Sequence, residues 1–362
     1  MITKPQTESW ITKIAGDKPL VISGPCSAET EDQVLQIAQQ LRDTNTKVFR
    51  AGVWKPRTRP GSFEGVGQVG LSWLQRVKSE TGLLVATEVA TKAHVEQALA
   101  ADIDVLWIGA RTTVSPFMVQ EIADALQGTD KIVLIKNPVS PDLSLWLGAM
   151  ERFQKAGIHN LGTIHRGFST YIKTKYRNNP EWQIAIDLKN NFPEIPMLID
   201  PSHMGGRRDL IANLSQTGLD LNYDGLMVET HIDPDNAWSD AAQQITPAAF
   251  SAILKQLTIR KPEEAEEKFL AKIDQLRLQI DAIDSQIMTN LGKRMKIADD
   301  IGVLKKQNNV AILQSKRWQE VLERMKTTGK TENLSEEFIT EIFKAIHQES
   351  IEHQHRISDN SL

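Results

Sequence analysis

The sequence of 362 residues contains a single cysteine, so the chain can form no internal disulfide. It has no apolar run of membrane-spanning length, and its first residues, MITKPQTESW, lack the apolar stretch of a signal peptide. It also has no large excess of either charge, and the formal net charge of −4 argues against a dedicated nucleic-acid binder. We therefore expect a soluble, cytoplasmic, globular protein that binds neither membranes nor nucleic acid.

The first 258 residues alternate short β-branched runs with segments that have the pattern of amphipathic helices. Eight such runs occur: LVIS (20–23), VFRAG (48–52), LLVATEV (83–89), VLWIG (105–109), IVLIK (132–136), NLGTIH (160–165), MLID (197–200) and GLMVET (225–230). Eight β/α units in about 250 residues predict a (β/α)8 barrel. A doubly wound open sheet is the alternative, but no GxGxxG motif follows the first run.

The remainder of the chain has the pattern of an all-helical domain. Residues 259–268, IRKPEEAEEK, are charged and contain a proline, which is typical of a linker between domains 1–258 and 269–362. Isoleucines and leucines then recur at heptad-like spacing, which predicts a helix over about 266–306, roughly 60 Å long. Two further helices are expected at 314–327 and 335–357. A domain this small cannot bury so long a helix alone, so we expect it to be shared in a homodimer.

Four residues with metal-binding side chains follow the expected strands. They are Cys26 after the first run, His203 after the seventh, and Glu229 and Asp240 around the end of the eighth. In a (β/α)8 barrel the carboxyl ends of the strands meet at one mouth, where the chemistry takes place. A thiolate, an imidazole and two carboxylates suit a divalent transition ion, and we expect manganese first, with iron, cobalt or zinc as alternatives.

Cationic side chains also follow the strands. They are Arg50, Lys55, Arg57, Arg111, Lys136 and Arg166. Six cations at one mouth would repel one another unless anions occupied it, and Arg binds phosphate and carboxylate through paired hydrogen bonds. The pattern therefore predicts substrates with at least two anionic groups, most simply phosphates.

Contiguous motifs extend this interpretation. GPCSAE (24–29), FRAGVWKPRTRPGSFEG (49–65), DPSHMGGRRDL (200–210) and VETHIDPDNAWSD (228–240) resemble the short bacterial type Iβ family of 3-deoxy-D-arabino-heptulosonate 7-phosphate (DAHP) synthases. The resemblance covers nearly all of residues 5–258. It implies a metal-dependent (β/α)8 barrel that condenses phosphoenolpyruvate with erythrose 4-phosphate. The sister family that makes 3-deoxy-manno-octulosonate 8-phosphate lacks the KPRT run, which is present here.

The resemblance also implies roles for single residues. The metal ligands would be Cys26, His203, Glu229 and Asp240. Arg111, Lys136 and Arg166 would hold phosphoenolpyruvate, with Arg50 and Lys55 near its carboxylate, whereas Arg57 and Thr58 would face the erythrose phosphate. Lys55, Glu88 and His203 are expected to take part in catalysis. The sequence leaves open whether a water on the metal, Glu88 or His203 activates the attacking water.

In the helical tail, Arg294 occupies a heptad core position in line with Ile273, Ile280, Ile287 and Ile301. A buried unpaired arginine is costly, so this position predicts an anionic partner. The spacing from Arg277 through Arg294, Lys305 and Arg317 to Ser350 and Gln354 resembles that of all-helical chorismate mutases. In that family these residues bind the carboxylates and the ether oxygen of chorismate, with Lys305 and Gln354 at the ether oxygen. Arg277 is expected to serve the partner's site in a dimer. Where the family commonly has acidic residues beside the substrate hydroxyl, this chain has Gln314, which can form a hydrogen bond, and Trp318, which cannot accept one.

The leading hypothesis is therefore a bifunctional enzyme of the shikimate pathway, in which prephenate formed in the tail inhibits the synthase. The alternative is a DAHP synthase whose tail is only a dimerising ligand sensor. A third interpretation, a nucleic-acid-binding bundle, is prompted by the lysines and arginines of 293–306 but is disfavoured by the net acidity.

Overall fold

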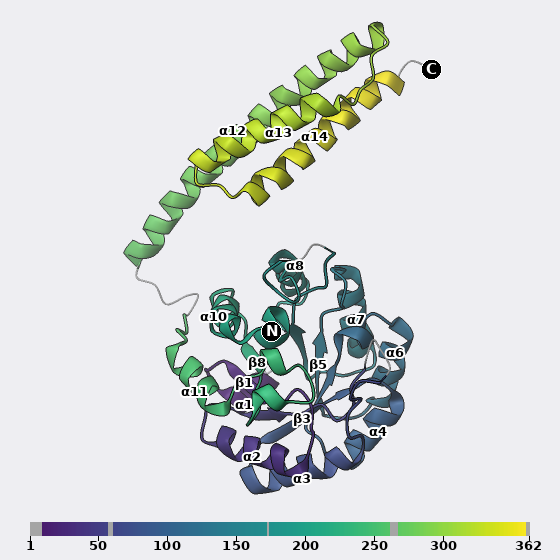
Figure 1. Cartoon of the computed structure of the whole chain (residues 1–362), viewed down its shortest axis with the longest axis vertical. Coiled ribbons are helices and arrows are strands. Elements are labelled where there is room, and N and C mark those ends of the chain that lie inside the picture. Colours follow the sequence, from purple (N-terminus) through teal and green to yellow (C-terminus); the bar gives the residue numbers. More distant parts are fainter. Residues whose placement is uncertain (1–8, 57–60, 172–173, 261–266, 360–362) are drawn as a thin grey trace, which may run out of the picture. The chain divides into compact units, whose positions relative to one another are not determined.

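The computed structural model describes residues 9–56, 61–171, 174–260 and 267–359. The chain divides into two compact units, Met1–Pro262 and Glu263–Leu362. In the first unit eight parallel strands close into a barrel in the order β1 to β8, and helices surround it (Figure 1). The predicted barrel is thus confirmed, and the open doubly wound sheet is wrong. None of the helices in the described part of the chain is long and apolar enough to cross a membrane.

The barrel strands coincide with the eight predicted runs. They are β1 (Leu20–Gly24), β2 (Val48–Arg50), β3 (Leu84–Val89), β4 (Val105–Ile108), β5 (Ile132–Lys136), β6 (Leu161–His165), β7 (Met197–Ile199) and β8 (Gly225–Glu229). The helices are α1 (Trp10–Ala15), α2 (Glu31–Arg42), α3 (Val69–Thr81), α4 (Lys92–Ala100), α5 (Ala110–Thr113), α6 (Pro116–Ala125), α7 (Leu143–Lys155), α8 (Trp182–Asn191), α9 (Pro201–Gly205), α10 (Ile211–Asp220) and α11 (Pro247–Gln256). Three 3-10 turns, η1 (Arg208–Leu210), η2 (Pro234–Asn236) and η3 (Ala241–Gln243), lie in the loops after β7 and β8.

Local sequence explains where several of these helices begin. The side chains of Thr30, Thr91, Asp142 and Thr246 each accept a hydrogen bond from a backbone N–H in the first turn of α2, α4, α7 and α11. Such caps satisfy donors that have no partner within the helix. The strands between the helices are buried on both faces, as expected for parallel strands covered by helices.

The barrel has two layers of core. The outer layer lies between the strands and the surrounding helices, and the inner layer fills the barrel with residues such as Leu20, Ile22, Trp107 and Met227. At the amino end of the strands, α1 packs against the inner layer, and the Trp10 indole donates a hydrogen bond of 2.8 Å to the carbonyl of Leu161. The barrel interior is therefore a packed core, and the opposite, carboxyl end is left for chemistry.

The described residues of the second unit, 267–359, form three helices. They are α12 (Glu267–Gln307), α13 (Ser315–Thr331) and α14 (Glu336–Asp359), close to the three predicted. α12 has 41 residues, and apolar side chains along it, including Leu278, Ile280, Ile287 and Met288, are at least half exposed. Within the described part of this unit the buried apolar side chains are Ala298 and Ile339. One copy of the unit therefore leaves much of its apolar surface in water, while the expected dimer stays a prediction.

Candidate active sites

The first site lies at the carboxyl ends of β1, β7 and β8. Gly24 ends β1, and a Cβ there would collide with the carbonyl oxygen of Arg50, so only glycine allows the close approach of β1 and β2. Cys26 lies two residues further along the chain and is 1% exposed. His203 stands in α9 after β7, and Glu229 is the last residue of β8. The strands and the loops after them thus place a thiol, an imidazole and a carboxylate at the same end of the barrel.

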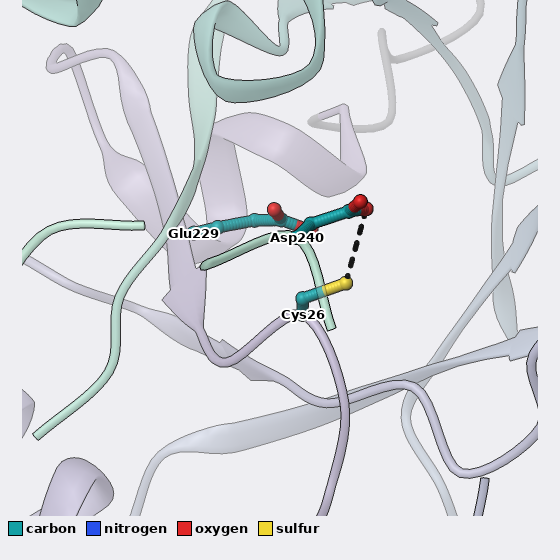
Figure 2. A group of neighbouring side chains, drawn as sticks. All are labelled: Cys26, Glu229 and Asp240. Atoms are coloured by element: carbon teal, nitrogen blue, oxygen red, sulfur yellow. Dashed lines mark hydrogen bonds between the residues drawn. The ribbon is translucent and has the colours of Figure 1, made fainter. Parts of the chain in front are cut away.

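Three of the four predicted metal ligands, Cys26, Glu229 and Asp240, come together there (Figure 2). The ligand atoms of Cys26, Glu229 and Asp240 all lie within 4.8 Å of one another, and Cys26 Sγ is 3.5 Å from Asp240 Oδ2. His203 Nε2 lies 3.6 Å from Glu229 Oε1 and 4.0 Å from Asp240 Oδ2. The four residues come from three separate parts of the chain, and the barrel brings them together.

His203 is oriented by the carboxylate of Asp200, which is not one of the four predicted metal ligands. Its Nδ1 lies 2.8 Å from Asp200 Oδ2, and Asp200 is the N-cap of α9. The same carboxylate oxygen accepts a hydrogen bond of 2.7 Å from Lys136 Nζ. A carboxylate beside Nδ1 favours the proton on that nitrogen and leaves the Nε2 lone pair facing Glu229 and Asp240.

The protonation states suit metal binding, with one exception. Burial lowers the pKa of His203, which keeps its ring neutral. Burial raises the pKa of Glu229 and Asp240, but the interaction with the His203 ring, and then with Arg50 for Glu229 and Arg177 for Asp240, outweighs that effect and holds both pKa values below their usual range. Burial and then Glu229 raise the pKa of Cys26 to about 11, so the thiol must lose a proton to become a ligand.

This donor set fits a divalent transition ion. A thiolate, an imidazole and two carboxylates are ligands such an ion accepts. Glu229 Oε1 is buried and accepts no hydrogen bond from the residues that the structure describes, although Arg50 Nη2 lies 3.3 Å away. A buried carboxylate oxygen without a hydrogen bond is costly, and a cation among these four side chains would satisfy it.

Buried cations line the floor of the mouth. Arg50 is 1% exposed and lies over the ring of Trp107, with 4.7 Å between its guanidinium carbon and the ring centroid. Lys136 is 4% exposed and pairs with Asp200 at 2.7 Å. Burial lowers the pKa of Arg166 to about 10, and its Nη1 donates to Asn178 Oδ1 at 2.7 Å. Arg50 and Lys136 thus already have carboxylate partners, so the predicted repulsion among the cations is partly balanced within the protein.

The other residues predicted for this site occupy its rim. Lys55 Nζ lies 3.2 Å from Cys26 Sγ, and Lys55 and Glu88 line one cavity of about 250 Å³. Glu88 Oε2 accepts a hydrogen bond from the Trp107 indole at 3.1 Å. Arg111 is exposed in α5, close enough to Arg166 to lower its pKa. Arg57 and Thr58 lie outside the described residues.

The second site is a cavity of about 350 Å³ among the three tail helices. Five of the six predicted tail residues line it: Arg294, Lys305, Arg317, Ser350 and Gln354. Arg294 donates to the hydroxyl of Ser350, and Lys305 donates to the carbonyl of Ile312 at 2.6 Å. The residues that line this cavity include neither Asp nor Glu, although Arg317 lies 3.6 Å from Glu320 outside the lining.

Arg277 is the one predicted tail residue that is absent from this cavity. Its side chain is 71% exposed and pairs with Asp274 at 3.1 Å. It lies 17 residues before Arg294 on the same helix, which corresponds to roughly 25 Å. Gln314 and Trp318 do line the cavity, and Trp318 stacks on His347 with 4.2 Å between ring centroids.

Several residues that shape the barrel site were not given a role by the sequence. Asp200, Arg177 and Gln243 contact the proposed ligands or their partners. The DPSH motif already placed Asp200 beside His203, so that signal was available. Arg177 and Gln243 lie in loops without a distinctive pattern, and only the folded chain brings them to the site.

Two family models match the chain. The model of the DAHP synthetase I family matches residues 3–262, and the model of chorismate mutase type II matches residues 276–355. The phospho-2-dehydro-3-deoxyheptonate aldolase of Thermotoga maritima is 30% identical over 245 residues, which cover 68% of this chain and 70% of the relative. The 2-dehydro-3-deoxyphosphooctonate aldolase of Prochlorococcus marinus is 27% identical over 267 residues, covering 68% of this chain and 90% of the relative.

Solved structures give the same result. A crystal structure of the phospho-2-dehydro-3-deoxyheptonate aldolase (DAHP synthase) of Thermotoga maritima has a TM-score of 0.60 and 28% identity. The match covers 67% of this chain and 68% of that chain. A truncated form of the synthase from the same organism has a TM-score of 0.57 and 26% identity, covering 67% of this chain and 86% of that chain.

Proposed function

The chain belongs to the DAHP synthetase I family and carries a chorismate mutase type II domain after its barrel, so it is a bifunctional enzyme, and from this premise we propose how its two sites work. In the barrel, phosphoenolpyruvate, erythrose 4-phosphate and water yield DAHP and inorganic phosphate. In the tail, chorismate rearranges to prephenate. We also propose that the enzyme works in the cytoplasm.

The barrel reaction joins two anions, and the buried cations offset their repulsion. Arg111, Lys136 and Arg166 hold the phosphate of phosphoenolpyruvate, and Arg50 and Lys55 lie near its carboxylate. Arg57 and Thr58 are assigned to the phosphate of erythrose 4-phosphate. This arrangement positions the methylene carbon of phosphoenolpyruvate against the aldehyde of erythrose 4-phosphate, which is a task of orientation and electrostatics.

Cys26, His203, Glu229 and Asp240 would hold a divalent ion, for which manganese is our first choice. When bound, such an ion supplies Lewis-acid polarisation of the aldehyde oxygen. Asp200 keeps the proton of His203 on Nδ1, and Lys136 in turn fixes Asp200. The new carbon–carbon bond joins the methylene carbon of phosphoenolpyruvate to the aldehyde carbon, whose oxygen takes up a proton. Water adds to the neighbouring carbon, which carries the phosphate group, and the carbon–oxygen bond to phosphate then breaks. Glu88 is our candidate for accepting the proton of that water, because a His203 ring with its proton on Nδ1 and its Nε2 directed to the ion has no free nitrogen.

The convergence of four metal-ligand side chains beside three buried cations is the observation that carries this proposal. The test is an assay of the intact protein for phosphate release from phosphoenolpyruvate and erythrose 4-phosphate, with and without a chelator. We expect turnover that the chelator abolishes and Mn²⁺ restores. Undiminished turnover in rigorously metal-free protein would contradict the metal requirement.

The octulosonate relatives make it necessary to test the aldehyde substrate separately. Arabinose 5-phosphate should be offered in place of erythrose 4-phosphate in the same assay. We expect erythrose 4-phosphate to be strongly preferred in kcat/KM, because the chain carries the KPRT run at 55–58. A preference for the five-carbon sugar would move the assignment to the sister reaction while leaving the chemistry of the site unchanged.

In the tail site, one carbon–oxygen bond of chorismate breaks as one carbon–carbon bond forms, with no covalent attachment to the protein. Arg294 and Arg317 pair with the substrate carboxylates, Ser350 assists, and Lys305 and Gln354 donate to the ether oxygen, where charge develops. Arg277 is too far along α12 to join them within one copy. We therefore assign it to the cavity of a second copy in a homodimer joined through the tail.

The second candidate function for the tail is that of a dimerising sensor without catalysis. It is favoured by Trp318, which cannot accept a hydrogen bond from the substrate hydroxyl. Loss of chorismate in a solution of the intact protein separates the two functions. In either case prephenate would bind the Arg294 and Lys305 cavity and inhibit the synthase, with a coupling worth about 1–3 kcal/mol. A synthase rate that prephenate leaves unchanged would refute this regulation.

A further inference from the structure

We propose that the adjacent glutamines Gln243 and Gln244 are positioning residues that set the spacing of three metal ligands, Cys26, Glu229 and Asp240. The inference rests on the proposed metal site. Both side chains are buried, at 1% and 0% exposure, in the loop after β8. Each uses both ends of its amide. Together they bond to the backbone of Cys26 in the loop after β1, to the side chain of Glu229 in β8 and to the backbone of Ser239 in the loop that carries Asp240.

Gln243 connects the two carboxylates. Its Nε2 donates to Glu229 Oε2 at 2.7 Å, and its Oε1 accepts from Arg177 Nη1 at 2.6 Å. The same Arg177 nitrogen donates to Asp240 Oδ1 at 3.0 Å. One oxygen of each carboxylate is therefore held, while the other oxygens, Glu229 Oε1 and Asp240 Oδ2, face His203 Nε2 at 3.6 and 4.0 Å.

Gln244 fixes the backbone on both sides of the cluster. Its Oε1 accepts a hydrogen bond of 3.0 Å from the backbone N–H of Cys26, and its Nε2 donates to the carbonyl of Ser239 at 2.8 Å. Ser239 directly precedes Asp240. Since Cys26 follows β1 and Ser239 follows β8, this single amide sets the distance between the loops that carry the thiol and the second carboxylate.

The backbone of Asp240 gives an independent sign of a constrained site. Its φ of 48° and ψ of 37° place it in the left-handed region, which non-glycine residues occupy at an energetic cost. Such a conformation persists when the surroundings determine it. Arg208 supplies part of that support, because its guanidinium donates to the carbonyls of Ala241 and Gln244 at 2.9 and 2.7 Å.

Amides suit this task better than charged groups would. An amide is both a donor and an acceptor, so Gln243 can bond to Glu229 and to Arg177 at the same time. It remains neutral, whereas a glutamate at the same place would put another negative charge beside Glu229. Residues that hydrogen-bond to metal ligands hold those ligands in the orientation that the metal needs. Losing one such hydrogen bond typically weakens metal affinity by about 10- to 100-fold.

The test compares Gln243→Met and Gln244→Met, which keep the side-chain length and remove the amide. Metal-free intact proteins are titrated with Mn²⁺, and separately with Co²⁺ so that the absorption of the cobalt–thiolate bond reports the geometry. We expect each variant to bind Mn²⁺ about 10- to 100-fold more weakly and to have an altered cobalt spectrum. Gln216→Met is the matched control, because Gln216 is hydrogen-bonded at both ends of its amide to Asp220 and Thr258, away from the ligands.

Two further measurements keep the result interpretable. Thermal unfolding of the metal-free variants shows whether the barrel is intact. Arg177→Met removes the hydrogen bonds that join Gln243 to Asp240, and it does so by changing a side chain that is 46% exposed. If Gln243→Met does not fold, Arg177→Met must still lose about tenfold in Mn²⁺ affinity. Folded variants that bind Mn²⁺ within twofold of the unaltered protein would overturn the proposal. The proposed function itself would fail differently, through a wild-type synthase that needs no metal.

Discussion

The two sites of this chain handle positive charge in opposite ways. In the barrel, Arg50 lies 3.3 Å from Glu229, and Lys136 pairs with Asp200 at 2.7 Å. In the tail, Arg294 donates to a hydroxyl and Lys305 to a backbone carbonyl. The barrel site therefore carries its own counterions, whereas the tail site has neutral partners for its two most enclosed cations.

The pKa shifts follow the same division. In the barrel the pKa values of Asp200, Glu229 and Asp240 are all held below their usual range, despite burial, by interactions with His203 and with neighbouring lysines and arginines. In the tail, burial lowers the pKa values of Arg294, Lys305 and His347, and the first two lower that of His347 further. The barrel is thus arranged to receive a cation among its acids, and the tail is arranged so that a bound anion supplies the missing counterion.

The largest expected difference between the two sites comes from removing a predicted metal ligand of the barrel. We expect Cys26→Ala or His203→Ala to reduce the synthase rate by about 10³-fold or more, because Lewis-acid stabilisation is worth several kcal/mol. Chorismate turnover should stay within twofold of the unaltered protein. The measurement is kcat/KM for both reactions on the same preparations. A parallel loss of both activities would show that the sites are not independent.

The corresponding change in the tail is Arg294→Ala. It removes the cation that is expected to pair with a substrate carboxylate, so we expect a fall of about 10²-fold or more in chorismate kcat/KM. Lys296→Ala on the same helix is the control, because Lys296 does not line this cavity. Arg277→Ala should also lose mutase activity if a second copy supplies that residue. Unchanged mutase kinetics for Arg294→Ala would remove the basis for the anion site.

The pH dependence of Mn²⁺ binding tests whether Cys26 of the barrel site is a metal ligand. Because the pKa of Cys26 is raised to about 11, its thiol is protonated at neutral pH and must release a proton when it becomes a ligand. His203 is neutral and the carboxylates are ionised, so about one proton is released in total. Mn²⁺ affinity should therefore rise by about tenfold per pH unit between pH 6.5 and 8, measured by titration of metal-free protein. A flat profile would indicate that Cys26 does not bind the ion.

The smallest expected effect concerns the aromatic wall of the tail cavity. Trp318→Ala removes the stack on His347, an interaction worth about 0.5–1.5 kcal/mol, so chorismate KM should rise by a few-fold. Trp318→Phe should retain most of the contact and serves as the control. If both variants have the same large defect, Trp318 has a role beyond packing.

The sequence was informative where periodicity or a contiguous motif carried the signal. All eight strands and the three tail helices lie close to their predicted positions, because burial on both faces of a parallel strand and on one face of a helix leaves a repeating pattern. The convergence of Cys26, His203, Glu229 and Asp240 was also foreseeable, since each lies at or after the end of a strand. The partners of those ligands were not, because Arg177 meets Asp240 across 63 residues and Cys26 meets Gln244 across 218. Contacts of that kind depend on loop geometry, which no local pattern encodes.

The helix that closes the amino end of the barrel has a consequence for the order of folding. Trp10 is among the first described residues, yet its indole bonds to Leu161, which lies 151 residues later. The neighbouring strand β1 likewise completes its pairing with β8, where Leu20 meets Gly225. Long loops must close before such contacts form, which makes them late events in folding. We therefore expect the first helix of the chain to be among the last elements to dock.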